Sequence, residues 1–201
     1  MHANRIRRWL LCIILWIGTI VPVQAFDSVV DRPYTPFWQA HYRLPLYTGI
    51  AVTGLAAYEG TQSRLGKTAF QSLDATLLSQ IATEGIKRAT GRLRPRATPD
   101  PNRWFEGGKS FPSGHVSSTT ALVTPFILEY GNDYPLTHLL WLFPIYEAEG
   151  RLRAHAHWQS DVLVGAAVGF VCGYVAHQRK TPLILYFDSD KVVVGLKYRF
   201  P

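Results

Sequence analysis

The stretch RLRAHAHWQSDVLVGAAVGFVCGYVAH, residues 151–177, decides the fold class. Its apolar run Val162–Ala176 is 15 residues long, which is longer than an ordinary strand and suits a helix. Four other segments carry apolar residues at three- and four-residue steps or in continuous runs: Tyr47–Glu59, Leu73–Thr90, Ser117–Tyr130 and Leu136–Ala148. Together with a helix over His157–His177, they predict an all-α fold, a helical bundle of about five to six helices.

The C-terminus follows a different pattern. Leu183–Asp188 and Val192–Phe200 are rich in β-branched and aromatic residues, with a turn at Ser189-Asp190-Lys191 between them. We therefore expect a short β-hairpin appendage over residues 183–201, after a helical domain over residues 26–182. Because an isolated hairpin is marginally stable in water, it should pack on the bundle or on a partner.

The N-terminus resembles a secretory signal peptide over residues 1–25. Arg5, Arg7 and Arg8 precede the apolar run Trp9–Val21, and small residues end at Ala25. The run has 13 residues, fewer than the roughly 20 that span a bilayer. We expect export to the periplasm or the envelope; the alternative is an uncleaved N-terminal anchor.

Composition narrows the class of protein. The chain has 201 residues, of which 47% are hydrophobic and 17% charged, so it is not intrinsically disordered. Removal of residues 1–25 leaves one cysteine, Cys172, and a mild excess of basic over acidic residues. No basic stripe is interleaved with aromatic residues, which argues against nucleic-acid binding. The apolar runs are short and the mean hydropathy is +0.01, so we expect a soluble or membrane-peripheral domain, with a polytopic inner-membrane protein as the alternative.

Three segments have the residue types of a phosphate site. In the first, Lys87 and Arg94 are seven residues apart, so a helical path would bring them to nearly one face. Two cations there suit a phosphate group, although a basic helix end would look the same. In the second, Pro112-Ser113-Gly114-His115 precedes a helical stretch. Free N–H groups at a helix start bind anions, and His115 could donate a proton; the alternative is an ordinary Ser-Gly turn.

The third segment contains Arg151, His157 and Asp161. His157 and Asp161 are four residues apart and would be neighbours on a helical face, where the carboxylate orients the imidazole. The alternative is a surface ion pair. His155 and His157 would diverge on a helix, so we expect no metal ion and no other cofactor. Arg92, Arg96 and Arg153 belong either to a cationic rim of the site or to the solvated surface.

In this order and spacing, the three segments resemble the signature of the type 2 phosphatidic acid phosphatase and vanadium haloperoxidase superfamily. The resemblance runs from about Leu73 to His177, roughly half of the chain. Gly150 departs from it, because the family usually has Ser before the arginine of the third segment. This change removes a hydroxyl group from the expected phosphate site.

The resemblance implies a role for each residue. His157 would be the nucleophile that forms a phosphohistidine, Asp161 its orienting partner, and His115 the general acid. The phosphoryl oxygens would be bound by cations and by one helix start: Lys87, Arg94, Arg151, Ser113 and Gly114. The fold implied is a helical bundle with this site at one end.

The resemblance also limits the substrate. Family members hydrolyse phosphates of lipids and isoprenoids or small soluble monoesters. We expect a metal-independent phosphatase acting on a lipid or isoprenoid phosphate at a membrane surface. The alternatives are a broad-specificity periplasmic acid phosphatase, a vanadate-dependent haloperoxidase, which the short chain disfavours, and a catalytically silent phosphate-binding module.

Overall fold

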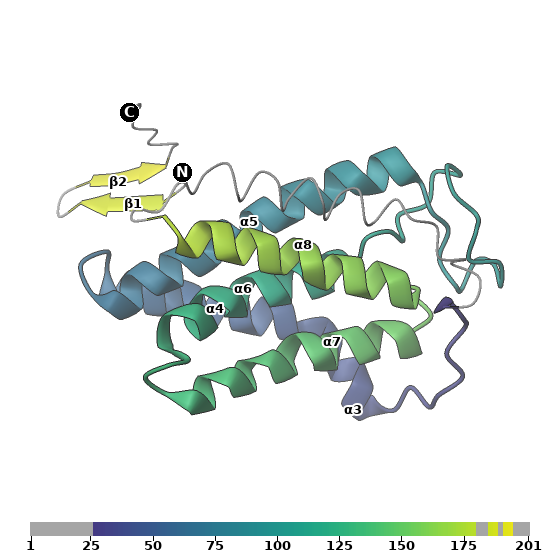
Figure 1. Ribbon diagram of the computed structural model, residues 1–201, viewed down its shortest axis with the longest axis horizontal. Helices are drawn as coiled ribbons and strands as arrows, with labels where there is room; N and C mark the ends of the chain where they lie inside the picture. The colour runs from purple at the N-terminus through teal and green to yellow at the C-terminus, as the bar shows by residue number, and fades with distance from the viewer. Residues whose placement is uncertain (1–25, 180–184, 189–190, 195–201) are drawn as a thin grey trace, which may run out of the picture.

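The computed structural model describes residues 26–179, 185–188 and 191–194, so the expected signal peptide lies outside the described residues. Five long helices form a bundle in which the axes run mainly along the length of the molecule (Figure 1). They are α4 (Leu44–Glu59), α5 (Arg64–Thr90), α6 (Gly114–Tyr130), α7 (Leu142–Arg153) and α8 (Gln159–His177). Shorter elements are α3 (Pro36–Gln39), η1 (Ala40–Arg43) and η2 (Pro135–Trp141). The predicted all-α bundle is confirmed.

Helix α8 packs closely on α6 because three glycines of its apolar run face that helix. A Cβ atom on Gly169 would lie 2.2 Å from the Ser117 carbonyl oxygen, and one on Gly173 would lie 2.5 Å from the Thr124 side chain. A larger residue would push the helices apart. The close packing brings the N-termini of both helices to the same end of the bundle, where the Ser113 N–H donates to the Asp161 carbonyl at 2.8 Å.

Several helix boundaries differ from the predictions, most of all the starts of α5 and α7. Helix α5 begins at Arg64 rather than Leu73, because the Ser63 hydroxyl accepts from the Gly66 N–H and caps an earlier start. Helix α7 begins at Leu142 rather than Leu136, and the preceding residues form η2. Pro144 then falls in the first turn of α7, where a missing N–H costs no hydrogen bond.

The C-terminal strands are β1 (Leu185–Asp188) and β2 (Lys191–Val194), which pair antiparallel with Leu185 opposite Val194. Lys191, which we expected in the turn, is the first residue of β2. Residues 183–184 and 195–201, together with the expected domain boundary at residue 182, lie outside the described residues.

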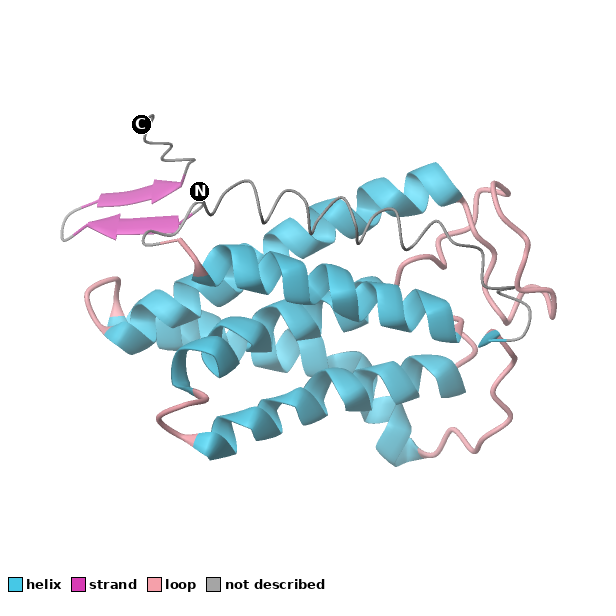
Figure 2. Cartoon of the chain, in the orientation of Figure 1, coloured by secondary structure: helices cyan, strands magenta, loops and turns pink. Residues whose placement is uncertain are grey.

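The long sides of the bundle expose many apolar side chains, while most of the loop residues lie at its ends (Figure 2). Among the described helices, α8 is the one whose length and composition would allow it to cross a membrane. Exposed apolar residues on α4, η2, α7 and α8 include Leu46, Tyr47, Ile50, Leu136, Leu139, Leu142, Ile145, Leu163, Phe170 and Val171, and α5 exposes Leu77 and Ile81.

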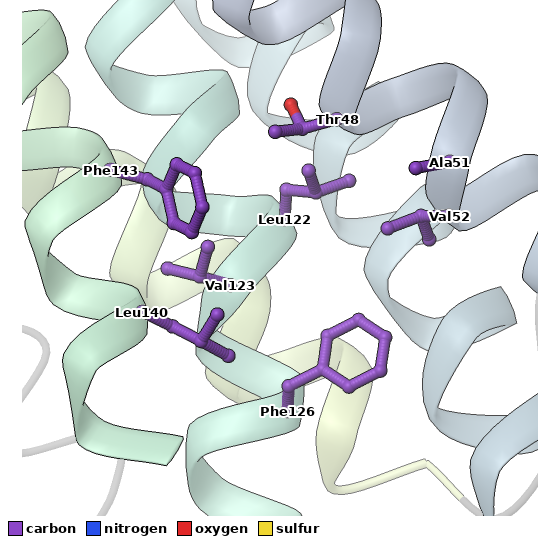
Figure 3. A pocket seen from close by; sticks show the side chains of 8 residues that line it. All are labelled: Thr48, Ala51, Val52, Leu122, Val123, Phe126, Leu140 and Phe143. Carbon is purple, nitrogen blue, oxygen red and sulfur yellow. The ribbon is translucent and has the colours of Figure 1, made fainter. Parts of the chain in front are cut away.

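An apolar groove opens on one of these sides, with a volume of about 240 Å³. Figure 3 shows Leu140 and Phe143 facing α4 across the side chains of α6. The lining residues are Thr48, Ala51, Val52, Leu122, Val123, Phe126, Leu140 and Phe143. Thr48 is one turn from the start of α4, so the groove begins near the end of the bundle that carries the three predicted segments.

Candidate active site

The three predicted segments meet at one end of the bundle. Helices α5 and α7 end there, and α6 and α8 begin there (Figure 1). Lys87 lies in the last turn of α5 and Arg151 in the last turn of α7. Ser113 is the N-cap of α6, and Asp161 lies in the first turn of α8. Two basic helix ends thus face two helix starts, which is an arrangement suited to an anion.

The path from Lys87 to Arg94 is helical only as far as Thr90, where the predicted helix also ends. Helix α5 ends at Thr90, and Gly91 turns the chain in the left-handed region at a φ of 54°. A Cβ on Gly91 would also lie 3.0 Å from the Gly107 nitrogen. Arg94 therefore reaches the site from the loop, where its guanidinium donates to the Lys109 carbonyl at 3.3 Å.

Three cations lie close to one another at the site, with Lys87 and Arg151 buried and Arg94 half-buried. Burial, and then the charge of Arg94, lowers the pKa of Lys87 to about 8. Burial and the charge of Arg151 lower the pKa of Arg94. The Lys87 ammonium donates to the Pro112 carbonyl, which leaves it two further N–H donors. Like charges that lower one another's pKa create a strong preference for an anion between them.

Arg151 is the most unusual of these cations, because its side chain is buried and under-bonded. It is 2% exposed, and its Nε and Nη1 atoms have no hydrogen-bond partner among the described residues. The guanidinium lies over the Tyr42 ring, 5.1 Å from its centre. Buried donors are almost always paired in folded proteins, so these two N–H groups are suited to donate to a bound anion.

Ser113 has a similar deficit. Its residue is fully buried, its hydroxyl has no partner among the described residues, and it forms no side-chain cap on α6. The N–H of Gly114, the first residue of α6, is one of the groups that a helix start leaves without an intrahelical acceptor. Together they supply neutral donors next to the cations.

Both histidines of the site are neutral at neutral pH. Burial, followed by the charges of Arg151 and His157, lowers the pKa of His115 to about 3. Burial lowers the pKa of His157 to about 4, although Asp161 opposes this shift. A neutral imidazole has a free lone pair, so His157 can act as a nucleophile.

The contact between His157 and Asp161 arises differently from the prediction. His157 precedes α8, whose N-cap is Trp158, so the two residues do not share a helical face. Asp161 is the third residue of the helix, and its Oδ2 accepts the Trp158 N–H at 2.9 Å in a capping box. The same oxygen lies 3.5 Å from His157 Nδ1, longer than a normal hydrogen bond. Nδ1 has no other partner among the described residues, so Nε2 is the nitrogen left for a substrate.

Asp161 is held firmly in this position. Its Oδ2 also accepts the Ser110 hydroxyl, and its Oδ1 accepts Arg92 Nη1 at 2.6 Å. Burial raises the pKa of the carboxyl, but contacts with His157 and Arg92 outweigh it and hold the pKa below its ordinary value. The carboxylate is therefore ionised and fixed in place.

Several residues around the site could not be found from the motifs. Arg92 is neither a rim cation nor a solvated residue, because it is fully buried between Asp161 and Asp27. Tyr42, from η1, contacts the His115 ring at 5.6 Å between ring centres. Asp27 and Tyr42 lie far from the motifs in sequence and have no local signal. Arg92 lies between Lys87 and Arg94, but nothing in the sequence around it indicates that it is buried.

The place of a side chain at Gly150 is taken by His41. A Cβ on Gly150 would lie 2.4 Å from two atoms of the His41 ring. His41 is fully buried, with Nδ1 3.0 Å from Glu147 Oε1 and Nε2 3.0 Å from the Tyr34 hydroxyl. The glycine is therefore required by packing in this chain.

His155 does not join the site. Its backbone lies in the left-handed region at a φ of 50°, and its Nε2 bonds to the Val30 carbonyl at 2.9 Å. In the part of the chain that the structure describes, no group of three His, Cys, Asp or Glu side chains could hold a metal ion.

The model of the PAP2 superfamily matches residues 69–183, more than half of the chain. The chain belongs to the PAP2 superfamily. This confirms the resemblance on which the expected site is based. All three segments lie within the PAP2 match, whereas Asp27, His41 and Tyr42 lie outside it.

Two curated relatives of this PAP2 chain are lipid phosphatases by name. A lipid A 1-phosphatase from Porphyromonas gingivalis is 32% identical over 160 residues, which cover 75% of this chain and 34% of the relative. Lipid phosphate phosphatase 1 from Arabidopsis thaliana is 30% identical over 142 residues, which cover 55% of this chain and 43% of the relative. The chain thus spans less than half the length of either relative. The crystal structure of Aquifex aeolicus LpxE has the same fold, with a TM-score of 0.55 at 20% identity, covering 74% of this chain and 89% of that one.

Proposed function

We propose that this protein is a metal-independent phosphatase that hydrolyses a lipid or isoprenoid phosphate monoester or diphosphate through a phosphohistidine. The observation that carries the proposal is the buried guanidinium of Arg151. Two of its N–H groups have no partner in the part of the chain that the structure describes, and the neutral imidazole of His157 lies beside it. Donors for a bound anion and a nucleophile therefore lie at the same place.

The first chemical step transfers the phosphoryl group to the enzyme. Its oxygens accept hydrogen bonds from Lys87, Arg94, Arg151, the Ser113 hydroxyl and the Gly114 N–H, which neutralise charge in the transition state. His157 Nε2 forms a bond to phosphorus while the bond from phosphorus to the leaving oxygen breaks. Asp161 accepts the Nδ1–H and stabilises the positive charge that develops on the ring.

His115 supplies a proton to the leaving oxygen. The low pKa of free His115 is caused by burial and neighbouring cations, so the negative charge of a bound phosphoryl group raises it. Phosphate monoesters lose their second proton at a pKa of about 6. A monoanionic substrate therefore brings a proton that passes to His115 and then to the alkoxide.

The second step returns the enzyme to its starting state. The now neutral His115 removes a proton from a water molecule, which attacks phosphorus as the bond to His157 breaks. The proton taken up by His115 passes to the departing phosphate, which leaves as a monoanion, and both His115 and His157 are again neutral imidazoles.

The apolar surface supports a lipid substrate at a membrane face. The curated relatives are named for lipid phosphates. The donors to the phosphoryl group form a phosphate cage, which consists of Lys87, Arg94, Ser113, Gly114 and Arg151. The apolar groove lined by Ala51, Leu122 and Phe143 begins near the end of the bundle that holds this cage. The cage therefore binds the head of a substrate whose acyl or isoprenoid chain occupies the groove. The exposed apolar residues around the bundle bind the membrane surface, and the periplasm is the proposed location.

The test uses the purified protein in EDTA with phosphatidic acid, undecaprenyl diphosphate and p-nitrophenyl phosphate. Wild type should release phosphate, and so should His155→Ala, because His155 lies outside the cage. His157→Ala should release none, because it lacks the nucleophile. Preference for the lipid substrates supports the lipid assignment. Absence of release from all substrates, or full activity in His157→Ala, would overturn the proposal.

A further inference from the structure

An N-terminal strap, residues 27–33, lies along the connection between α7 and α8 that carries His157. The Ser28 N–H donates to Gln159 at 3.0 Å, and Arg32 forms an ion pair with Glu149 at 2.9 Å. The carbonyls of residues 30 and 33 bond to His155 and Arg153, at 2.9 and 2.8 Å. The strap lies outside the part of the chain that matches the PAP2 superfamily.

Asp27, at the start of the strap, caps α8 from outside the helix. It is buried, and its Oδ1 accepts the Ser160 N–H at 2.7 Å. Its Oδ2 accepts the Ser160 hydroxyl and Arg92 Nη2, both at 2.6 Å. A carboxylate at this position accepts a hydrogen bond from a free N–H of the first helical turn, and its negative charge interacts favourably with the positive end of the helix dipole.

Arg92 connects Asp27 with Asp161. Its Nη2 donates to Asp27 at 2.6 Å, and its Nη1 donates to Asp161 Oδ1 at 2.6 Å. The remaining N–H groups donate to the Pro101 carbonyl and the Ser160 hydroxyl, so all five donors have acceptors. The guanidinium also lies 4.4 Å from the centre of the Trp104 ring. Arg92 is therefore fixed between two carboxylates.

We propose that Asp27 is a positioning residue that acts through Arg92 to hold Asp161 against His157. Its part in the reaction rests on the proposed function. Arg92 shares its positive charge between two carboxylates, which leaves Asp161 a strong acceptor for the His157 Nδ1–H. Without the charge of Asp27, Arg92 would pair with Asp161 alone and compete with His157 for it.

The test compares Asp27→Asn with Asp31→Asn. The second variant removes the same charge from the same strap, at an exposed residue. We expect kcat of Asp27→Asn to fall about tenfold or more, as for a misplaced catalytic group. Its KM and its inhibition by inorganic phosphate should stay within about twofold of wild type, because Asp27 does not touch the cage. Arg92→Lys, which keeps the charge but cannot bind both carboxylates, should show the same split if Asp27→Asn folds poorly.

Two results would overturn the proposal. One is a kcat of Asp27→Asn equal to that of wild type and Asp31→Asn. The other is a loss of kcat that follows only the loss of folded protein, measured by circular dichroism.

A second readout needs no substrate. With ¹⁵N-labelled histidine, and assignment by the signal lost in His157→Ala, the Nδ1 resonance of His157 should shift in Asp27→Asn and not in Asp31→Asn. If the wild type hydrolyses nothing while this shift occurs, the proposed function fails and the positioning role remains. If the wild type is active while neither kcat nor the resonance changes in Asp27→Asn, the positioning role fails alone.

Discussion

Replacement of Arg151 by methionine should stabilise the free protein and remove its activity. The side chain is 2% exposed, and its Nε and Nη1 atoms lack partners among the described residues. Each unsatisfied buried donor costs about 1–3 kcal/mol, more when it is charged. The charge also opposes that of Arg94. Against this, the contact with Tyr42 contributes about 0.5–2 kcal/mol.

The free energies therefore favour the variant when no ligand is bound. We expect the free energy of unfolding of Arg151→Met to rise by about 1 kcal/mol or more. Activity changes in the opposite direction. Two charge-assisted hydrogen bonds to the phosphoryl group, at about 1.5–3 kcal/mol each, correspond to a loss of about 10²–10⁴ in kcat/KM.

The assay is urea unfolding of both proteins with and without inorganic phosphate, together with kcat/KM. Phosphate should stabilise wild type by mass action and leave Arg151→Met unchanged. Arg153→Met is the control, since Arg153 bonds to Glu149 and the Pro33 carbonyl outside the cage. It should lose stability and keep activity. A destabilised Arg151→Met that still binds phosphate would refute the reasoning.

Four further predictions concern pH, phosphate affinity, packing and the groove. For a phosphate monoester, kcat/KM should be highest between about pH 4, below which His157 is protonated, and about pH 6, above which the substrate loses its proton; a kcat/KM that falls on neither side of this range would contradict it. Inhibition by inorganic phosphate should weaken above about pH 8 as Lys87 becomes neutral, and Lys87→Arg should abolish this change in the inhibition constant. Gly150→Ala should lower the free energy of unfolding by about 1–3 kcal/mol in urea titrations, because its Cβ would overlap the His41 ring; unchanged stability would show that the ring is free to move. Ala51→Trp should lower kcat/KM for long-chain lipid phosphates about tenfold by displacing two or more methylenes, while p-nitrophenyl phosphate hydrolysis stays at the wild-type rate; equal losses would exclude the groove as the chain site.

The helices could be predicted from sequence because apolar periodicity and capping are local. The predicted segment Leu73–Thr90 ends at the same residue as α5, and α8 was predicted from its apolar run. The start of α7 could not be placed, because Pro144 is compatible with both a helix interrupted at that point and a helix that begins there.

The sequence indicated residues that the structure brings together, but it did not indicate how they come into contact. His157 and Asp161 are close, but through a capping box rather than a shared helical face. Arg92 resembled a surface residue, because its burial depends on Asp27, whose contact with Ser160 spans 133 residues. Such contacts depend on the tertiary structure and leave no local pattern.

The most direct test of the central claim is to trap the phosphorylated enzyme. The protein is mixed with substrate, quenched in alkali, where phosphohistidine survives, digested, and analysed by mass spectrometry. The account predicts one added phosphoryl group on the peptide that contains His157, and none in His157→Ala. An active enzyme that carries no phosphoryl group on His157, or carries it on another residue, would contradict the account.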